Sequence, residues 1–104
     1  PYLVNNKLSP KAAEGKKIYE HYNCASCHSG AYHTDQKSHR IGKDVEFEQG
    51  WDTPALTEVW RTAPYLFDGR AATMFDVFYE HRHGIHDDIS RANAEALAEY
   101  VNSL

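Results

Sequence analysis

The sequence predicts an all-α fold made of four or so short helices. Apolar residues recur at helical spacing in several segments, and serine, threonine or proline stands where each segment should begin. The chain has 104 residues, of which 41% are hydrophobic. That size and composition are typical of one globular domain. We therefore expect residues 1–104 to form a single domain, either alone or cut from a longer chain.

The first helix is expected over residues 11–22, after an irregular arm. Ser9 can cap this helix, and Pro10 suits the first helical position, where no backbone donor is needed. Gly15 lowers helix propensity. Its presence inside the helix therefore indicates close packing against another helix.

The other helices are expected in the second half of the chain, over residues 55–62, 74–81 and 90–103. Thr73 can cap the second of these. The polar stretch 29–54 is expected to form a long loop. Such a loop is uncommon in a small domain unless it covers something.

The most informative motif is the run Cys-Ala-Ser-Cys-His at positions 24–28. Two cysteines separated by two residues and followed at once by histidine are typical of a c-type haem site. Cys24 and Cys27 would form thioethers with the two vinyl groups, and His28 would ligate the iron from below. A redox dithiol or half of a zinc site fits less well, because a helix precedes the motif and zinc needs two further ligands. We therefore predict one covalently bound haem c.

Other segments resemble known haem proteins. Residues 15–19, leading into the motif, resemble the opening of class I cytochrome c domains. Residues 52–56 and 60–70 resemble the C-terminal, electron-transferring haem domain of bacterial di-haem cytochrome c peroxidases. The resemblance covers residues 12–104 and implies a class I cytochrome c-like fold around one haem. Only one haem motif is present, so the resemblance does not imply peroxidase activity.

The resemblance also bears on the second axial ligand of the iron. Matching the family pattern from Pro64 puts His81 at the ligand position, and matching it from the His-Gly pair puts His83 there. Met74, the sole methionine, is expected in the first turn of a helix, which favours a core role. We predict His83 as the distal ligand, with His81 and then Met74 as alternatives.

Two further residues of the matched block are candidates for haem contact. Arg61 could neutralise a haem propionate, and Tyr65 could pack against the porphyrin. A solvated ion pair and ordinary core packing are the alternative interpretations.

Together these features predict one-electron transfer, by a carrier or by a relay domain of a larger redox protein, rather than catalysis. The partner would be a redox protein or an adjacent redox domain. The alternative function is a haem peroxidase or sensor with an open or displaceable sixth ligand. The net charge of −4 argues against nucleic-acid binding, and no apolar run is long enough to span a membrane. The cytochrome resemblance implies haem attachment after export, hence the bacterial periplasm or cell surface.

Overall fold

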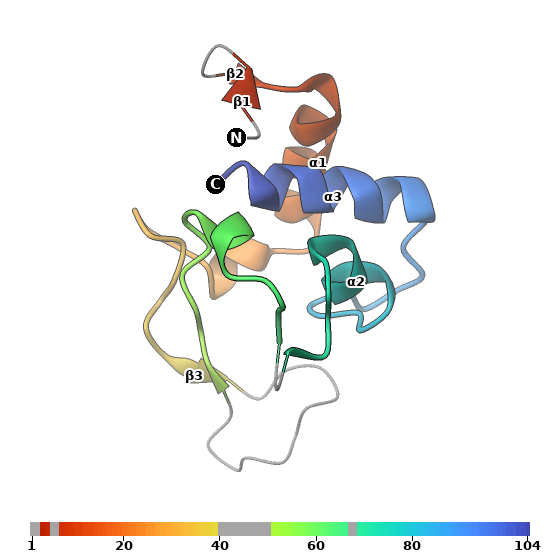
Figure 1. The fold of residues 1–104 in the computed structure, drawn as a ribbon. Coiled ribbons are helices and arrows are strands. Elements are labelled where there is room, and N and C mark those ends of the chain that lie inside the picture. The colour runs from red at the N-terminus through yellow and green to blue at the C-terminus, as the bar shows by residue number, and fades with distance from the viewer. Residues whose placement is uncertain (1–2, 5–6, 40–50, 67–68) are drawn as a thin grey trace.

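The computed structural model describes residues 3–4, 7–39, 51–66 and 69–104. Figure 1 shows two long helices, α1 (Pro10–His21) and α3 (Arg91–Asn102), crossing at a steep angle. The short helix α2 (Met74–Tyr79) packs beside α3. The all-α class predicted from the sequence is confirmed.

All three helices begin at the caps that the sequence predicts. The hydroxyls of Ser9, Thr73 and Ser90 each accept a hydrogen bond from a backbone N–H in the first turn. At Thr73 the cap is reciprocal, because the Asp76 carboxylate also accepts from the Thr73 N–H at 3.2 Å. These contacts satisfy donors that have no partner within the helix.

The crossing of α1 over α3 depends on Gly15. A β-carbon at this position would lie 1.9 Å from the carbonyl oxygen of Ala96, so only glycine allows the two backbones to come this close. One turn further along, the rings of Tyr19 and Tyr100 meet edge to face with centroids 5.2 Å apart. The close packing predicted from Gly15 is confirmed.

The core lies where the three helices meet a 3₁₀ turn, η2 (Val59–Arg61). Within it, Leu97 and Val101 are the largest fully buried side chains. The other buried members of the cluster are Tyr19, Val59, Ala71, Met74, Val77, Phe78, Ile85, Ile89, Ala94 and Ala98.

The helix expected over residues 55–62 is wrong in extent, because only η2 is helical. Glu58 has a left-handed φ of +56°, and its N–H donates to the carbonyl of Leu104 at 2.9 Å. In an α-helix that N–H would bond to the carbonyl of Pro54. The Pro54 carbonyl is thereby left to interact with the ring of His28.

Two small strand pairs complete the described structure. In the N-terminal arm, β1 (Leu3–Val4) pairs antiparallel with β2 (Lys7–Leu8), so this arm is less irregular than expected. In the long loop, β3 (Ser38–His39) pairs antiparallel with β4 (Trp51–Asp52). Residues 40–50 of that loop lie outside the described residues.

Candidate haem site

The cysteine motif lies on a tight turn directly after α1. Asn23 takes a left-handed φ of +57°, which ends the direction of α1 and starts the 3₁₀ turn η1 (Cys24–Ser26). The N–H groups of Cys27 and His28 both donate to the carbonyl of Cys24, at 3.3 and 3.0 Å. Because the segment is wound in this way, Cys24, Cys27 and His28 all line one cavity.

Contacts from three directions fix the position of His28. Its Nδ1 lies 3.1 Å from the carbonyl oxygen of His33, and its own carbonyl accepts from the Tyr19 hydroxyl at 3.1 Å. Burial lowers the pKa of His28, although the carbonyls of His33 and Pro54 act in the opposite direction. A neutral imidazole that donates through Nδ1 leaves the Nε2 lone pair available, which is the form that binds a metal.

The two cysteines do not have the character of a redox pair. Both are half-buried free thiols, and burial raises the pKa of Cys24 to about 11. The thiol is therefore protonated at neutral pH, whereas dithiol exchange requires a thiolate. Among the residues that the structure describes, no three His, Cys, Asp or Glu side chains are grouped as a metal-ion site would require. These observations favour haem attachment over the two alternatives.

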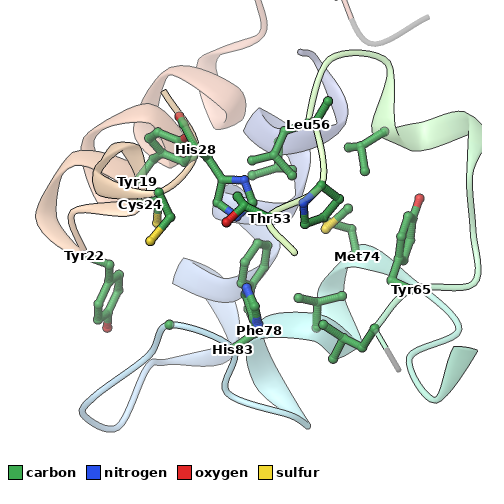
Figure 2. Close-up of a pocket in the computed structure, with 18 of the residues that line it drawn as sticks. Tyr19, Tyr22, Cys24, His28, Thr53, Leu56, Tyr65, Met74, Phe78 and His83 are labelled. Atoms are coloured by element: carbon green, nitrogen blue, oxygen red, sulfur yellow. The ribbon is translucent and has the colours of Figure 1, made fainter. Parts of the chain in front are cut away.

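A cavity of about 720 Å³ opens beside the motif, within the range of about 300–1,000 Å³ that is common for cofactor sites. Figure 2 shows Cys24 and Tyr65 at opposite ends of it, with His28 and His83 entering from opposite sides. The lining is mainly apolar and aromatic, as a porphyrin requires. It includes Tyr19, Tyr22, Leu56, Val59, Leu66, Met74, Val77, Phe78 and Val101.

The structure separates the three candidates for the second iron ligand. His83 lines the cavity, and its ring centroid lies 6.4 Å from that of His28, with the planes tilted by 54°. His81 does not line the cavity, and its Nε2 lies 3.1 Å from the carbonyl oxygen of Arg70. Met74 lines the cavity but is buried in the core, with 5% of its surface exposed.

Arg61 and Tyr65 have different positions. Tyr65 lines the cavity, and a two-way backbone pairing with Ala71 holds it there. Arg61 is exposed and does not line the cavity. Its guanidinium lies over the ring of Trp60 at 5.2 Å and its Nε is 3.9 Å from the Glu58 carboxylate. The structure therefore does not bring Arg61 to the site.

Several residues that position the site are not identifiable from the sequence. The backbone carbonyls of His33 and Pro54 face His28, and the Thr34 hydroxyl donates to the Thr53 carbonyl at 2.6 Å. Backbone carbonyls leave no signal in residue identity. Tyr22 also lines the cavity, and its place two residues before the first cysteine is the only signal that could have identified it.

The comparisons with known proteins agree with this site. A family model described as cytochrome c matches residues 12–104. Searches of curated proteins and of solved structures return no significant match. In the part of the chain that the structure describes, no helix is long and apolar enough to cross a bilayer. Because the family model matches most of an all-α chain, the protein belongs to the cytochrome c family of class I fold, whose members bind haem c and transfer electrons to and from redox partners.

Proposed function

We propose that this chain is a one-electron carrier or relay domain with a single haem c, attached at Cys24 and Cys27 and ligated by His28 and His83. The haem supplies the reversible change between ferric and ferrous iron. Each thiol adds across a vinyl group, its hydrogen going to the neighbouring carbon, so the thioethers form without an oxidant. The resemblance to the electron-transferring half of the di-haem peroxidases is consistent with a relay.

The observation that carries the proposal is the distance between the two histidine rings. An imidazole nitrogen binds a divalent metal ion at about 2.0–2.1 Å and lies about 1.1 Å from its ring centre. Two imidazoles on opposite sides of one iron therefore have ring centres about 6 Å apart. The rings of His28 and His83 are 6.4 Å apart across the cavity. Their spacing leaves room for one metal ion between them.

The side chains around the cavity have separate tasks. The His33 carbonyl orients His28, and the Tyr19 hydroxyl holds the backbone of the same residue. Phe78, Val77 and the other apolar lining residues exclude water, which favours the less charged ferrous state. Tyr65 lies at the end of the cavity away from Cys24, where its ring can pack against the porphyrin.

Ligation by two histidines implies a lower reduction potential than ligation by histidine and methionine, because a thioether ligand raises the potential. It also fills both axial positions, which suits electron transfer and leaves no site for peroxide. The choice of His83 over Met74 therefore determines both the redox range and the class of function.

The test is optical and near-infrared spectroscopy of the haem-loaded protein in both oxidation states. We expect a low-spin spectrum without the sulfur-to-iron charge-transfer band, which turns high-spin in His83→Ala and stays low-spin in the matched control His81→Ala. A sulfur-to-iron band in the wild type would make Met74 the ligand. A high-spin wild type would replace electron transfer by an open-site peroxidase or sensor.

A further inference from the structure

The loop that carries His83 connects α2 to α3 and has no regular secondary structure. We call residues 80–90 the distal loop. Two of its residues, Arg82 and Gly84, have left-handed φ values of +51° and +70°. Two apolar side chains, Ile85 and Ile89, are buried in the core. The loop is therefore anchored at two points after His83, and its path at His83 itself depends on polar contacts.

Arg82, the residue before His83, closes the loop on itself. Its Nη1 donates to the carbonyl of Asp87 at 2.6 Å, and its Nη2 pairs with the Asp88 carboxylate at 2.9 Å. The carbonyl of Arg82 accepts from the Ile85 N–H at 3.0 Å. One side chain thus joins the two ends of the segment that contains His83.

Tyr22 ties the closed loop to α1. Its hydroxyl donates to Oδ1 of Asp87 at 2.6 Å, and its ring meets that of His86 edge to face at 5.3 Å. Burial, followed by the hydrogen bond to Asp87, raises the pKa of Tyr22 to about 12, so the hydroxyl remains a donor at neutral pH. Tyr22 also lines the haem cavity and stands two residues before Cys24. The segment that would hold the haem covalently and the loop that would ligate it distally therefore meet at this hydrogen bond.

We propose that Tyr22, Asp87 and Arg82 are positioning residues that keep His83 at the iron and so control how readily another ligand takes the sixth position. This inference rests on the proposed role of His83. An exogenous ligand binds only while His83 is displaced, so its apparent affinity reports the fraction of protein in which the distal loop has moved away. Loss of one hydrogen bond to a charged group should raise that fraction roughly three- to tenfold.

The experiment measures imidazole binding to the ferric haem-loaded protein by optical titration and stopped flow, together with the reduction potential. Tyr22→Phe removes only the hydroxyl, and Asp87→Ala removes its acceptor. Each should raise imidazole affinity about three- to tenfold, and the double variant should resemble either single variant, because both remove the same bond. Asp87→Asn keeps an acceptor oxygen and should restore most of the wild-type affinity. Arg82→Ala should act in the same direction, and Arg82→Lys less strongly.

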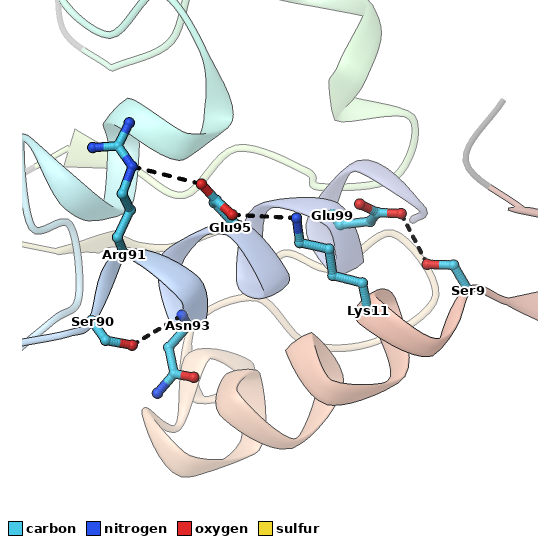
Figure 3. Close-up of polar contacts among 7 residues, drawn as sticks. All are labelled: Ser9, Lys11, Ser90, Arg91, Asn93, Glu95 and Glu99. Atoms are coloured by element: carbon cyan, nitrogen blue, oxygen red, sulfur yellow. Dashed lines mark hydrogen bonds and ion pairs between the residues drawn. The ribbon is translucent and has the colours of Figure 1, made fainter.

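A matched control separates positioning from general stability. Ser9 donates to the carboxylate of Glu99 at 2.9 Å, a side-chain hydrogen bond that also joins α1 to a distant segment but is far from the cavity (Figure 3). Glu99→Ala should leave imidazole affinity and reduction potential unchanged, and circular dichroism shows whether each variant retains its helices.

Two results would overturn the proposal, and they differ. If His83→Ala raises imidazole affinity while Tyr22→Phe and Asp87→Ala leave it at the wild-type value, the positioning role is wrong and His83 remains the ligand. If His83→Ala itself changes neither the spin state nor imidazole binding, the ligation by His83 is wrong and the positioning role fails with it.

Discussion

Gly15 on α1 lies against the backbone of Ala96 on α3 so closely that a β-carbon at Gly15 would stand 1.9 Å from the Ala96 carbonyl oxygen. It would also stand 2.8 Å from Cβ of Tyr100. Neither atom is the end of a flexible side chain, so the two helices would have to separate. This contact makes the helix crossing, and with it one wall of the haem cavity, dependent on a single hydrogen atom.

Gly15→Ala should therefore destabilise the haem-loaded protein by about 3 kcal/mol or more, measured by urea unfolding. Helix propensity alone favours alanine by about 1 kcal/mol, so the sign of the effect separates packing from propensity. Ala13→Gly, at an exposed position of the same helix, is the control and should cost about 1 kcal/mol. A Gly15→Ala protein as stable as the wild type would contradict the close approach.

The positions of the helices could be predicted from the sequence because local signals fix them. Caps at Ser9, Thr73 and Ser90 and apolar spacing gave three helix starts, and Gly15 gave the close crossing. These features depend on residues within a few positions of one another. Tertiary contacts had little chance to override them.

The segment over residues 55–62 could not be predicted because a distant contact decides it. The N–H of Glu58 bonds to the carbonyl of Leu104, at the other end of the chain. The choice between His81 and His83 has a similar cause. The two residues are separated only by Arg82, whose left-handed φ turns the chain between them. Which ring faces the cavity depends on that turn and on contacts to Tyr22, which spacing alone does not reveal.

Thr73→Ala should lower the free energy of unfolding by about 1 kcal/mol, because it removes the cap of α2. The Thr73 hydroxyl accepts from the Asp76 N–H at 3.2 Å, and α2 has only six residues over which to recover the loss. Thermal unfolding followed by circular dichroism is the measurement. Thr73→Ser keeps the hydroxyl and should retain most of the stability. If serine were as destabilising as alanine, the methyl group and not the cap would be responsible.

Glu95→Gln should change stability by less than about 1 kcal/mol, although Figure 3 shows Glu95 between two cations. Its carboxylate lies 3.4 Å from Nζ of Lys11 and 3.7 Å from Nε of Arg91, but all three side chains are exposed. At 1 M salt, where the Debye length is about 3 Å, the difference from the wild type should vanish. Urea unfolding at low and high salt measures both values.

Leu97→Ala, two positions along the same helix, gives the comparison of scale. Leu97 is fully buried, so its truncation should cost about 2–5 kcal/mol at either salt concentration. A salt-independent loss of several kcal/mol in Glu95→Gln would show that the ion pairs, and not core packing, hold α1 to α3.

Tyr22 should contribute to stability at neutral pH and lose that contribution at alkaline pH. Its pKa is about 12 in the folded protein, raised by burial and by the hydrogen bond to Asp87, and is about 10 when unfolded. A group whose pKa is raised on folding stabilises the fold fully below the unfolded value and loses this as pH rises towards the folded value. Urea midpoints of wild type and Tyr22→Phe, measured from pH 8 to 12, should therefore converge between pH 10 and 12.

The other groups around Tyr22 do not produce the same convergence. Asp87 and Arg82 keep their charge over this range, and the rings of His21 and His86, which pack against Tyr22, are neutral throughout it. Cys24 does not titrate once it is a thioether. Lysines and the remaining tyrosines titrate in both proteins, so their effects cancel in the difference. A gap between the two midpoints that stayed constant from pH 8 to 12 would mean that the Tyr22 hydroxyl does not hold Asp87 in solution, which would also remove the structural basis for its positioning role.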